Sequence, residues 1–212
     1  MNTLFFALQT IPDTEVGRIR YQLGDLHDKG SAKAMFHHQQ QQTGSCNLPH
    51  YLQKIITLSA IYSDDQGETT HYSWAGDVLT EKEILQQFSQ LVEKHLPRLV
   101  LWNGDFNIPV MRYRCLKNRV VSTYFFAESE AQRVVNLQSV LSAYRVDANT
   151  TIQNVSVLLG LKASVSLEYQ AVWKAWLAGD VATLRLFCEQ RVLNIYEIYQ
   201  CYLLVKGGIF DK

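Results

Sequence analysis

The sequence predicts an α/β fold in which a mixed sheet of five strands is flanked by helices. Short apolar stretches rich in β-branched and aromatic residues alternate with longer segments of helical periodicity. Of the 212 residues, 47% are hydrophobic and 11% aromatic, which is typical of a packed globular protein. This length suits one core, so we expect a single domain over residues 1–212.

The first predicted strand covers residues 3–10 and ends at the proline turn of FFALQTIPD. Alternate residues of a strand face the same side, so Ala7 and Gln9 share one surface near the end of the strand. Loosely spaced apolar residues over 14–33 indicate a helix. The polar stretch HHQQQQTGSCNLP then predicts a surface loop or a helix end, and we expect a polar loop or insertion around residues 34–49.

A hairpin follows, because YLQKIITLSAIYS and ETTHYSWAG have strand composition and flank the turn DDQG. Thr80 and Glu83 form a predicted capping box at the start of a helix that reaches His95. RLVLWN is the next short strand, and Pro109 in the first turn begins a helix over 108–118. After a short strand near Val134 the pattern is helical, over 137–144, 151–159, 168–178 and 181–205.

The charge and cysteine content restrict the class of protein. Lys plus Arg equals Asp plus Glu at 20 each, so a nucleic acid would have to bind a local patch. The four cysteines are scattered without a C-x-x-C pair, which predicts free thiols in a reducing compartment. No basic region precedes the first apolar run, and no run approaches the ~20 residues of a membrane helix. We therefore expect a cytoplasmic protein without a membrane partner.

Six segments of the chain carry a family resemblance. In order they are FFALQTIPD, LPHYLQKIITLSAIY, LVLWNGDFNIPVM, VVNLQSVLSAY, VSVLLGL and VWKAWLAGDVATLRLFCEQRVLNIYEIY. Together they resemble the predicted 3′-5′ exonuclease family related to the proofreading domain of B-type DNA polymerases, which is DnaQ-like and ribonuclease H-like. The resemblance implies a five-stranded ribonuclease H-like sheet and hydrolysis of phosphodiesters by two Mg²⁺ or Mn²⁺ ions held by carboxylates.

This chain departs from the family at the positions that hold the metal ions. The first strand should carry D-x-E, the segment after N-G an Asp, the short helix after the fifth strand an Asp, and the last helix a Tyr and an Asp. The resemblance places non-acidic residues at all of these positions: Ala7, Gln9, Asn107, Asn136, Phe187 and Arg191.

These replacements remove the chemistry that the family implies. Mg²⁺ prefers anionic oxygen ligands, and a guanidinium such as that of Arg191 stays protonated and repels a cation. We therefore predict no catalytic residue and no metal cofactor, in a degenerate domain that binds single-stranded nucleic acid or a protein partner. Two alternatives stay open: an active Mg²⁺- or Mn²⁺-dependent 3′-5′ exonuclease with displaced ligands such as Asp105 and Glu189, and a structural or scaffolding subunit.

Two groups of residues are candidates for binding. Arg191 either binds a phosphate or a carboxylate or pairs with a neighbouring acid, and the neutral candidates around it are Gln9, Asn103, Asn107 and Asn136. The segment RYRCLKNR forms the second group. Either it binds a single strand through positive charge on one helix and an aromatic side chain that stacks on a base, or it is only a solvated helix face. Its residues are Arg112, Tyr113, Arg114, Lys117 and Arg119.

Overall fold

The computed structural model describes residues 2–127, 133–162 and 167–207. Its sheet has five strands in the order β3-β2-β1-β4-β5. The hairpin strands pair antiparallel with each other and with β1, whereas β4 and β5 add in parallel on the other side of β1. This confirms the predicted mixed α/β sheet, whose strands are β1 (Thr3–Pro12), β2 (Gln53–Ser63), β3 (Thr69–Ala75), β4 (Arg98–Leu101) and β5 (Val134–Asn136).

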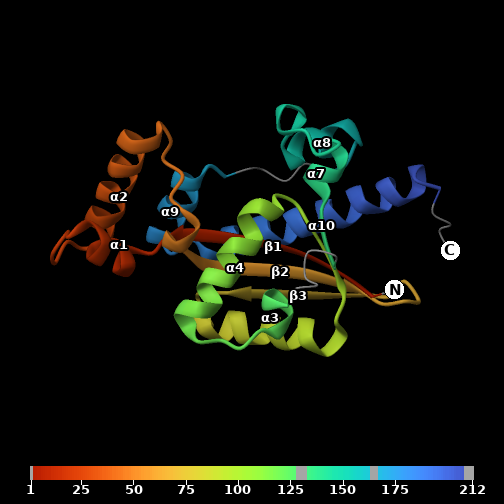
Figure 1. Ribbon diagram of the computed structural model, residues 1–212, viewed down its shortest axis with the longest axis horizontal. Coiled ribbons are helices and arrows are strands. Elements are labelled where there is room, and N and C mark those ends of the chain that lie inside the picture. The colour runs from red at the N-terminus through yellow and green to blue at the C-terminus, as the bar shows by residue number, and fades with distance from the viewer. Residues whose placement is uncertain (1, 128–132, 163–166, 208–212) are drawn as a thin grey trace.

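Helices cover both faces of the sheet. Helices α1 and α2 lie at one end of the molecule, α10 runs the length of one face, and α7 and α8 lie beside α10 at the top of the view (Figure 1). The described helices are α1 (Thr14–Tyr21), α2 (Asp28–Thr43), α3 (Glu81–His95), α4 (Gly104–Asn118), α5 (Thr123–Phe126), α7 (Leu137–Leu141), α8 (Ile152–Leu158), α9 (Tyr169–Leu177) and α10 (Val181–Val205), with short 3-10 turns at His50–Leu52 and Val146–Ala148.

Alternate side chains of the central strand β1 pack into two separate apolar cores, one on each face of the sheet. Its even-numbered residues, among them Phe6, pack with α3 and α4 in one apolar cluster. Its odd-numbered residues Phe5 and Ala7 pack with Cys188 and Val192 of α10 in the other. The strand alternation therefore turns Gln9 toward α10, and a β-bulge between Gln9 and Thr10 then shifts the register.

Several predicted boundaries agree with the structure. Helix α10 covers the predicted residues 181–205, and α3 begins with the predicted capping box. In that box the Glu83 carboxylate accepts a hydrogen bond from the backbone N–H of Thr80 at 2.7 Å, and the Thr80 hydroxyl accepts one from the backbone N–H of Glu83 at 3.3 Å.

Two sequence predictions differ from the structure, the first only in part, because a helix end was one of its two alternatives. Most of the polar segment 34–49 is helical, because α2 continues to Thr43 and only the residues after it form a loop. Glutamine is a good helix former, and Met35 and Phe36 give α2 an apolar face that packs in a third core cluster. Helix α4 begins at Gly104 instead of Ile108, so Pro109 lies inside the helix instead of in its first turn.

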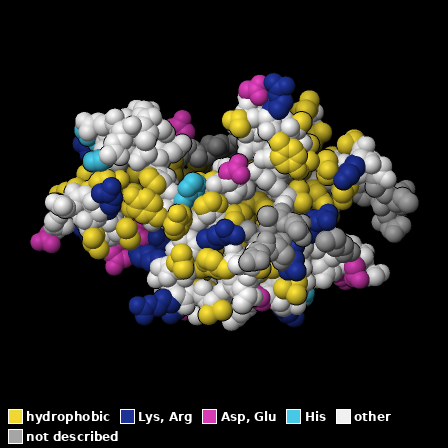
Figure 2. Space-filling model, in the orientation of Figure 1, with side chains coloured by type: hydrophobic (Ala, Val, Ile, Leu, Met, Phe, Trp, Pro, Cys, Tyr) yellow, Lys and Arg dark blue, Asp and Glu magenta, His cyan; other side chains and the backbone are white. Residues whose placement is uncertain are grey.

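The surface shows no concentration of one charge on the visible face. Lys and Arg side chains alternate there with Asp, Glu and neutral side chains (Figure 2). None of the helices in the described part of the chain is both long enough and apolar enough to cross a membrane.

Candidate functional site

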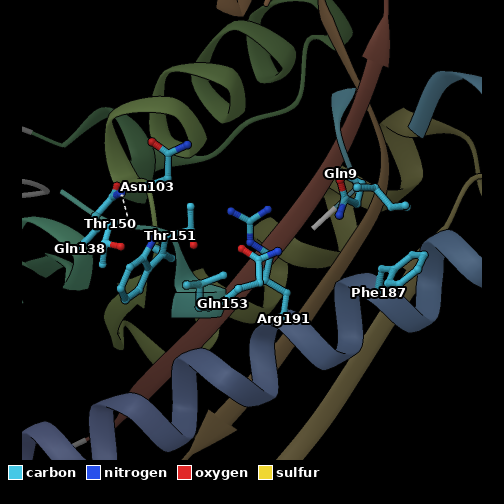
Figure 3. A pocket seen from close by; sticks show the side chains of 11 residues that line it. Gln9, Asn103, Gln138, Thr150, Thr151, Gln153, Phe187 and Arg191 are labelled. Carbon is cyan, nitrogen blue, oxygen red and sulfur yellow. Dashed lines mark hydrogen bonds between the residues drawn. The ribbon is translucent and has the colours of Figure 1, made fainter. Parts of the chain in front are cut away.

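Two adjoining cavities lie between the end of β1, the start of α4 and the middle of α10. One has a volume of about 230 Å³ and the other about 440 Å³. Both are lined by Gln9, Asn103, Leu167 and Arg191, so they adjoin, and we call the two cavities together the cleft. Figure 3 shows the Arg191 guanidinium extending from α10 into this space.

Arg191 is the charged residue at the centre of the cleft. It follows Phe187 by four residues, about one helical turn, and both side chains line the smaller cavity. Arg191 is partly buried and makes no ion pair or hydrogen bond with any described residue. Desolvation lowers the pKa of Arg191, although the nearby Cys188 acts in the opposite direction. The cleft therefore contains a cation without a compensating anion among the described residues.

Three amide side chains around Arg191 also lack partners. Gln9 on β1, Asn103 before α4 and Gln153 on α8 line the smaller cavity, and their side chains form no hydrogen bond within the described chain (Figure 3). Asn103 has a positive φ of 58°, a backbone conformation that asparagine tolerates better than most residues. Each amide offers both a donor and an acceptor to whatever occupies the cleft.

Ala7 and Asn107 stabilise the fold. They are two of the six positions at which the family resemblance implies a residue of the metal site, which we call the degenerate positions. Ala7 is 1% exposed, and its carbonyl oxygen lies 3.2 Å from the Cys188 Sγ, which donates to it. Asn107 is 5% exposed, and its Nδ2 donates to the Trp102 carbonyl oxygen at 2.8 Å. Ala7 is thus part of the core beneath the cleft, and Asn107 fixes the turn that begins α4 while also lining the larger cavity.

Asn136 is not brought into the cleft. Its Nδ2 donates to the Ser139 hydroxyl at 2.8 Å, and it lines a separate cavity together with Gly104 and Asp105. A Cβ on Gly104 would lie 3.1 Å from that of Asn136, so glycine allows this close approach. Asp105 therefore lines the separate cavity and neither cavity of the cleft.

The residues that line the cleft do not fit a pair of divalent metal ions. The described lining of both cavities contains no Asp and no Glu. Across the described residues no group of three or more His, Cys, Asp or Glu side chains is placed to hold a metal ion. Neither Glu189 nor Asp105 lines the cleft, so neither stands in for the replaced acids in this conformation.

The basic segment of α4 differs from the expected binding surface. Arg114 is 1% exposed, and its guanidinium lies 2.6 Å from both the Asp13 and the Glu81 carboxylates. Lys117 pairs with Asp13 at 2.7 Å and with Glu15 at 2.9 Å. The structure thus corrects the prediction for Arg114, because this side chain fastens α4 to the N-cap of α1 and to α3 and is not available to a ligand.

The two remaining arginines of this segment lie apart from the cleft. Arg112 donates through Nε to the Phe125 carbonyl oxygen at 2.7 Å, and Arg119 is exposed at the C-cap of α4. Neither lines either cavity. The basic segment therefore mainly holds α4 against neighbouring elements, and of its basic residues only Arg119 is exposed and apart from these contacts.

Sequence reasoning did not find part of the cleft wall. The segment Thr150–Gln153 and Gln138 line the smaller cavity, and the Gln138 Nε2 donates to the Thr150 carbonyl oxygen at 2.8 Å. Residues 150–153 belong to none of the six segments that carry the family resemblance, and Gln138 lies within VVNLQSVLSAY without being a candidate there. The sequence signal nearest to them is Thr151, which caps α8 by accepting from the Asn154 backbone N–H.

The class of this protein is an exonuclease-like domain built on a mixed five-stranded sheet, and its fold is similar to parts of solved structures. The structure of the family B DNA polymerase from the archaeon Pyrobaculum calidifontis matches with a TM-score of 0.60 at 15% identity, covering 96% of this chain and 24% of the polymerase. E. coli exonuclease I with a dT13 oligonucleotide matches with a TM-score of 0.45 at 12% identity, covering 87% of this chain and 41% of the exonuclease chain. A complex named ExoI/SSB-Ct matches with a TM-score of 0.44 at 13% identity, covering 88% of this chain and 42% of the matched chain.

The family follows from the sequence match. Residues 45–212 match the model of a predicted 3′-5′ exonuclease family related to the exonuclease domain of PolB, and the chain belongs to this family. No curated protein matches the chain. The chain spans about a quarter of the polymerase and about two fifths of exonuclease I.

Proposed function

We propose that this domain binds single-stranded nucleic acid without cutting it. The observation that carries the proposal is the composition of the cleft, in which Arg191 is surrounded by neutral amides and the described lining contains no carboxylate. The family relationship supplies the class of ligand. The domain keeps the exonuclease scaffold and has lost the means of two-metal hydrolysis.

Electrostatics argues against metal binding in the cleft. A dication about 4 Å from a guanidinium is repelled by on the order of 8 kcal/mol at an effective dielectric of about 20. Amide oxygens carry no net charge to offset that repulsion, and Mg²⁺ gives up its water ligands reluctantly. Loss of a single catalytic group commonly lowers a rate by several orders of magnitude, so the loss of the whole set abolishes the reaction.

End-labelled single-stranded DNA and RNA, incubated with Mg²⁺ or Mn²⁺, test the absence of hydrolysis. We expect no metal-dependent shortening, together with a mobility shift of the same strands that weakens steeply with salt as phosphate contacts release counterions. Shortening that Asp105→Ala abolishes would support the alternative of an active exonuclease with displaced ligands. Strands that stay intact and show no shift at low salt would contradict the binding function.

A protein partner is the second candidate function, favoured by an apolar groove at the far end of the molecule. This groove of about 330 Å³ lies between α7, α8 and α10, and beside it Leu158 is 80% and Val205 82% exposed. Exposed apolar surface of this kind often marks a contact with another protein. A defined oligomer in sedimentation experiments that Leu158→Glu dissociates would favour this scaffolding function, whereas a monomer at all concentrations would oppose it.

A further inference from the structure

We propose that Arg191 converts the position of the lost metal ions into an anion site that binds a phosphate group directly. The inference deepens the proposed binding function and rests on it for the class of macromolecule. In place of cations that bridge carboxylates and phosphate, the protein supplies its own fixed cation. A nucleic acid strand, a nucleotide and free inorganic phosphate all present the same oxyanion, and the experiment below distinguishes these three sources.

The surroundings of Arg191 suit an anion. Its guanidinium extends into the cleft without a carboxylate partner among the described residues, while the arginines at 114, 145 and 185 are all paired with acids. Arginine binds phosphate through two parallel N–H donors, and such charge-assisted bonds are about twice as strong as neutral ones. Within the described residues, the Arg191 guanidinium therefore remains available to pair with an anion in the cleft.

Neutral donors line the same cavity as the guanidinium. They come from three parts of the fold, with Gln9 on β1, Asn103 before α4 and Gln153 on α8 (Figure 3). Their amide N–H groups can bond the remaining oxygens of a phosphate, which is smaller than either cavity. The amides around Arg191 supply N–H donors to an anion, whereas their carbonyl oxygens carry no net charge to attract a hard cation against the guanidinium.

Aromatic side chains adjoin the site on two sides. Phe187 lies one helical turn before Arg191, and Phe106 with its ring contact to His50 lines the larger cavity. A base attached to the bound phosphate would find a ring to stack on. These rings favour a nucleotide-bearing phosphate over the free ion.

Binding is measured by calorimetry and fluorescence anisotropy, in EDTA, with three probes: inorganic phosphate, a nucleoside monophosphate and a labelled single-stranded oligonucleotide. We expect the dissociation constants to rise about 10- to 100-fold in Arg191→Gln, the range that one charge-assisted contact spans. Addition of Mg²⁺ should not strengthen binding. The order of affinity among the probes identifies the source of the phosphate.

Two further variants make the test sharp. Gln9→Glu places a carboxylate on the same cavity, where it should pair with Arg191 and weaken phosphate binding without removing the guanidinium. Arg185→Gln, on the same helix, removes a paired arginine that does not line the cleft, and it should bind every probe as the unaltered protein does. Thermal unfolding checks that each variant is folded.

The outcomes separate this proposal from the proposed function. Strands that bind equally well to the unaltered protein and to both cleft variants would overturn the Arg191 site and leave non-catalytic binding intact. Phosphate or nucleotide binding that depends on Arg191, with no oligonucleotide binding, would support the site and contradict the nucleic-acid function. Absence of binding by all three probes would overturn the site.

Discussion

Ala7 stands where the family resemblance implies a metal-binding Asp, and its methyl group packs in a buried core. Ala7 lies under the cleft among Phe5, Val100 and Cys188, all of them buried. A carboxylate at this position makes sense only when a cation lies close enough to compensate for its lost hydration. The residue that suits position 7 therefore depends on what occupies the cleft, and alanine suits the core if the cleft holds no cation, as we propose.

The Ala7→Asp variant should lose about 3–5 kcal/mol of unfolding free energy, the usual cost of an uncompensated buried charge. Urea denaturation measures the change. Ala182→Asp is the matched control, because Ala182 is exposed in the first turn of α10, where an acid costs little or even helps. An Ala7→Asp protein as stable as the unaltered one would mean that position 7 is solvated and open to a metal ligand.

At the scale of helices and strands, the buried ion pairs of Arg114 join three elements. Arg114 on α4 binds Asp13 at the N-cap of α1 and Glu81 in the first turn of α3, and Glu81 also accepts from the Ile55 backbone N–H of β2 at 2.7 Å. Each charge has a partner, so the network is satisfied. Removing one member leaves the others buried without compensation.

Arg114→Met should therefore lower the free energy of unfolding by about 3–5 kcal/mol. Arg119→Asn is the control on the same helix, since Arg119 is exposed and asparagine accepts its positive φ of 53°, so a change of no more than ~0.5 kcal/mol is expected. Equal stability of the two variants in guanidinium titrations would show that the network contributes nothing to the fold.

The same network gives stability a pH dependence. Burial raises the pKa of Asp13, but the hydrogen bond from Lys117 and the charge of Arg114 outweigh burial, so the pKa lies below its ordinary 3.8. A depressed pKa in the folded state contributes stability above the ordinary value, and this is lost as the pH falls through the folded value. We expect the unfolding free energy of the unaltered protein to decline below about pH 4 more steeply than that of Asp13→Asn.

The elements that the sequence predicted well are those with a local signal. The capping box of α3, the hairpin and the long apolar repeat of α10 depend on neighbouring residues, and each agrees with the structure. The sequence does not reveal that Arg114 turns inward, because its partner Asp13 is 101 residues away along the chain. Nor does it place Thr150–Gln153 on the cleft, because that contact depends on how α8 packs against α10.

For the molecule as a whole, the residues that build the scaffold are largely distinct from those that line the cleft. The five-stranded sheet and its helices are complete in the described residues, and the two cores on either side of β1 hold α10 in position. The degenerate positions divide between these roles, since Ala7 and Asn107 stabilise the fold whereas Gln9, Phe187 and Arg191 line the cleft. Asn136 lies outside it, so the motif positions of the family do not all converge on one point in this chain.

Divalent metal should therefore have no effect on the stability of the unaltered protein. An ion that binds only the folded state adds about 2.7 kcal/mol at a concentration of 100 times its dissociation constant. For a chain of this size each kcal/mol moves the melting temperature by about 2–4 °C, so an intact metal site would raise it by about 5–10 °C. We expect the same melting curve in EDTA and in millimolar Mn²⁺.

The combined variant Ala7→Asp, Gln9→Glu, Asn107→Asp and Arg191→Asp provides the positive control, because it restores acids to four positions of the family motif. In EDTA it should melt below the unaltered protein, since Ala7 and Asn107 are buried and Asn107 loses its bond to the Trp102 carbonyl oxygen. Mn²⁺ should bind to it in calorimetry and recover part of the loss, because the ion neutralises the new carboxylates. If Mn²⁺ instead raises the melting temperature of the unaltered protein, the cleft holds metal despite Arg191; if it fails to bind the combined variant, the assignment of these four motif positions is wrong.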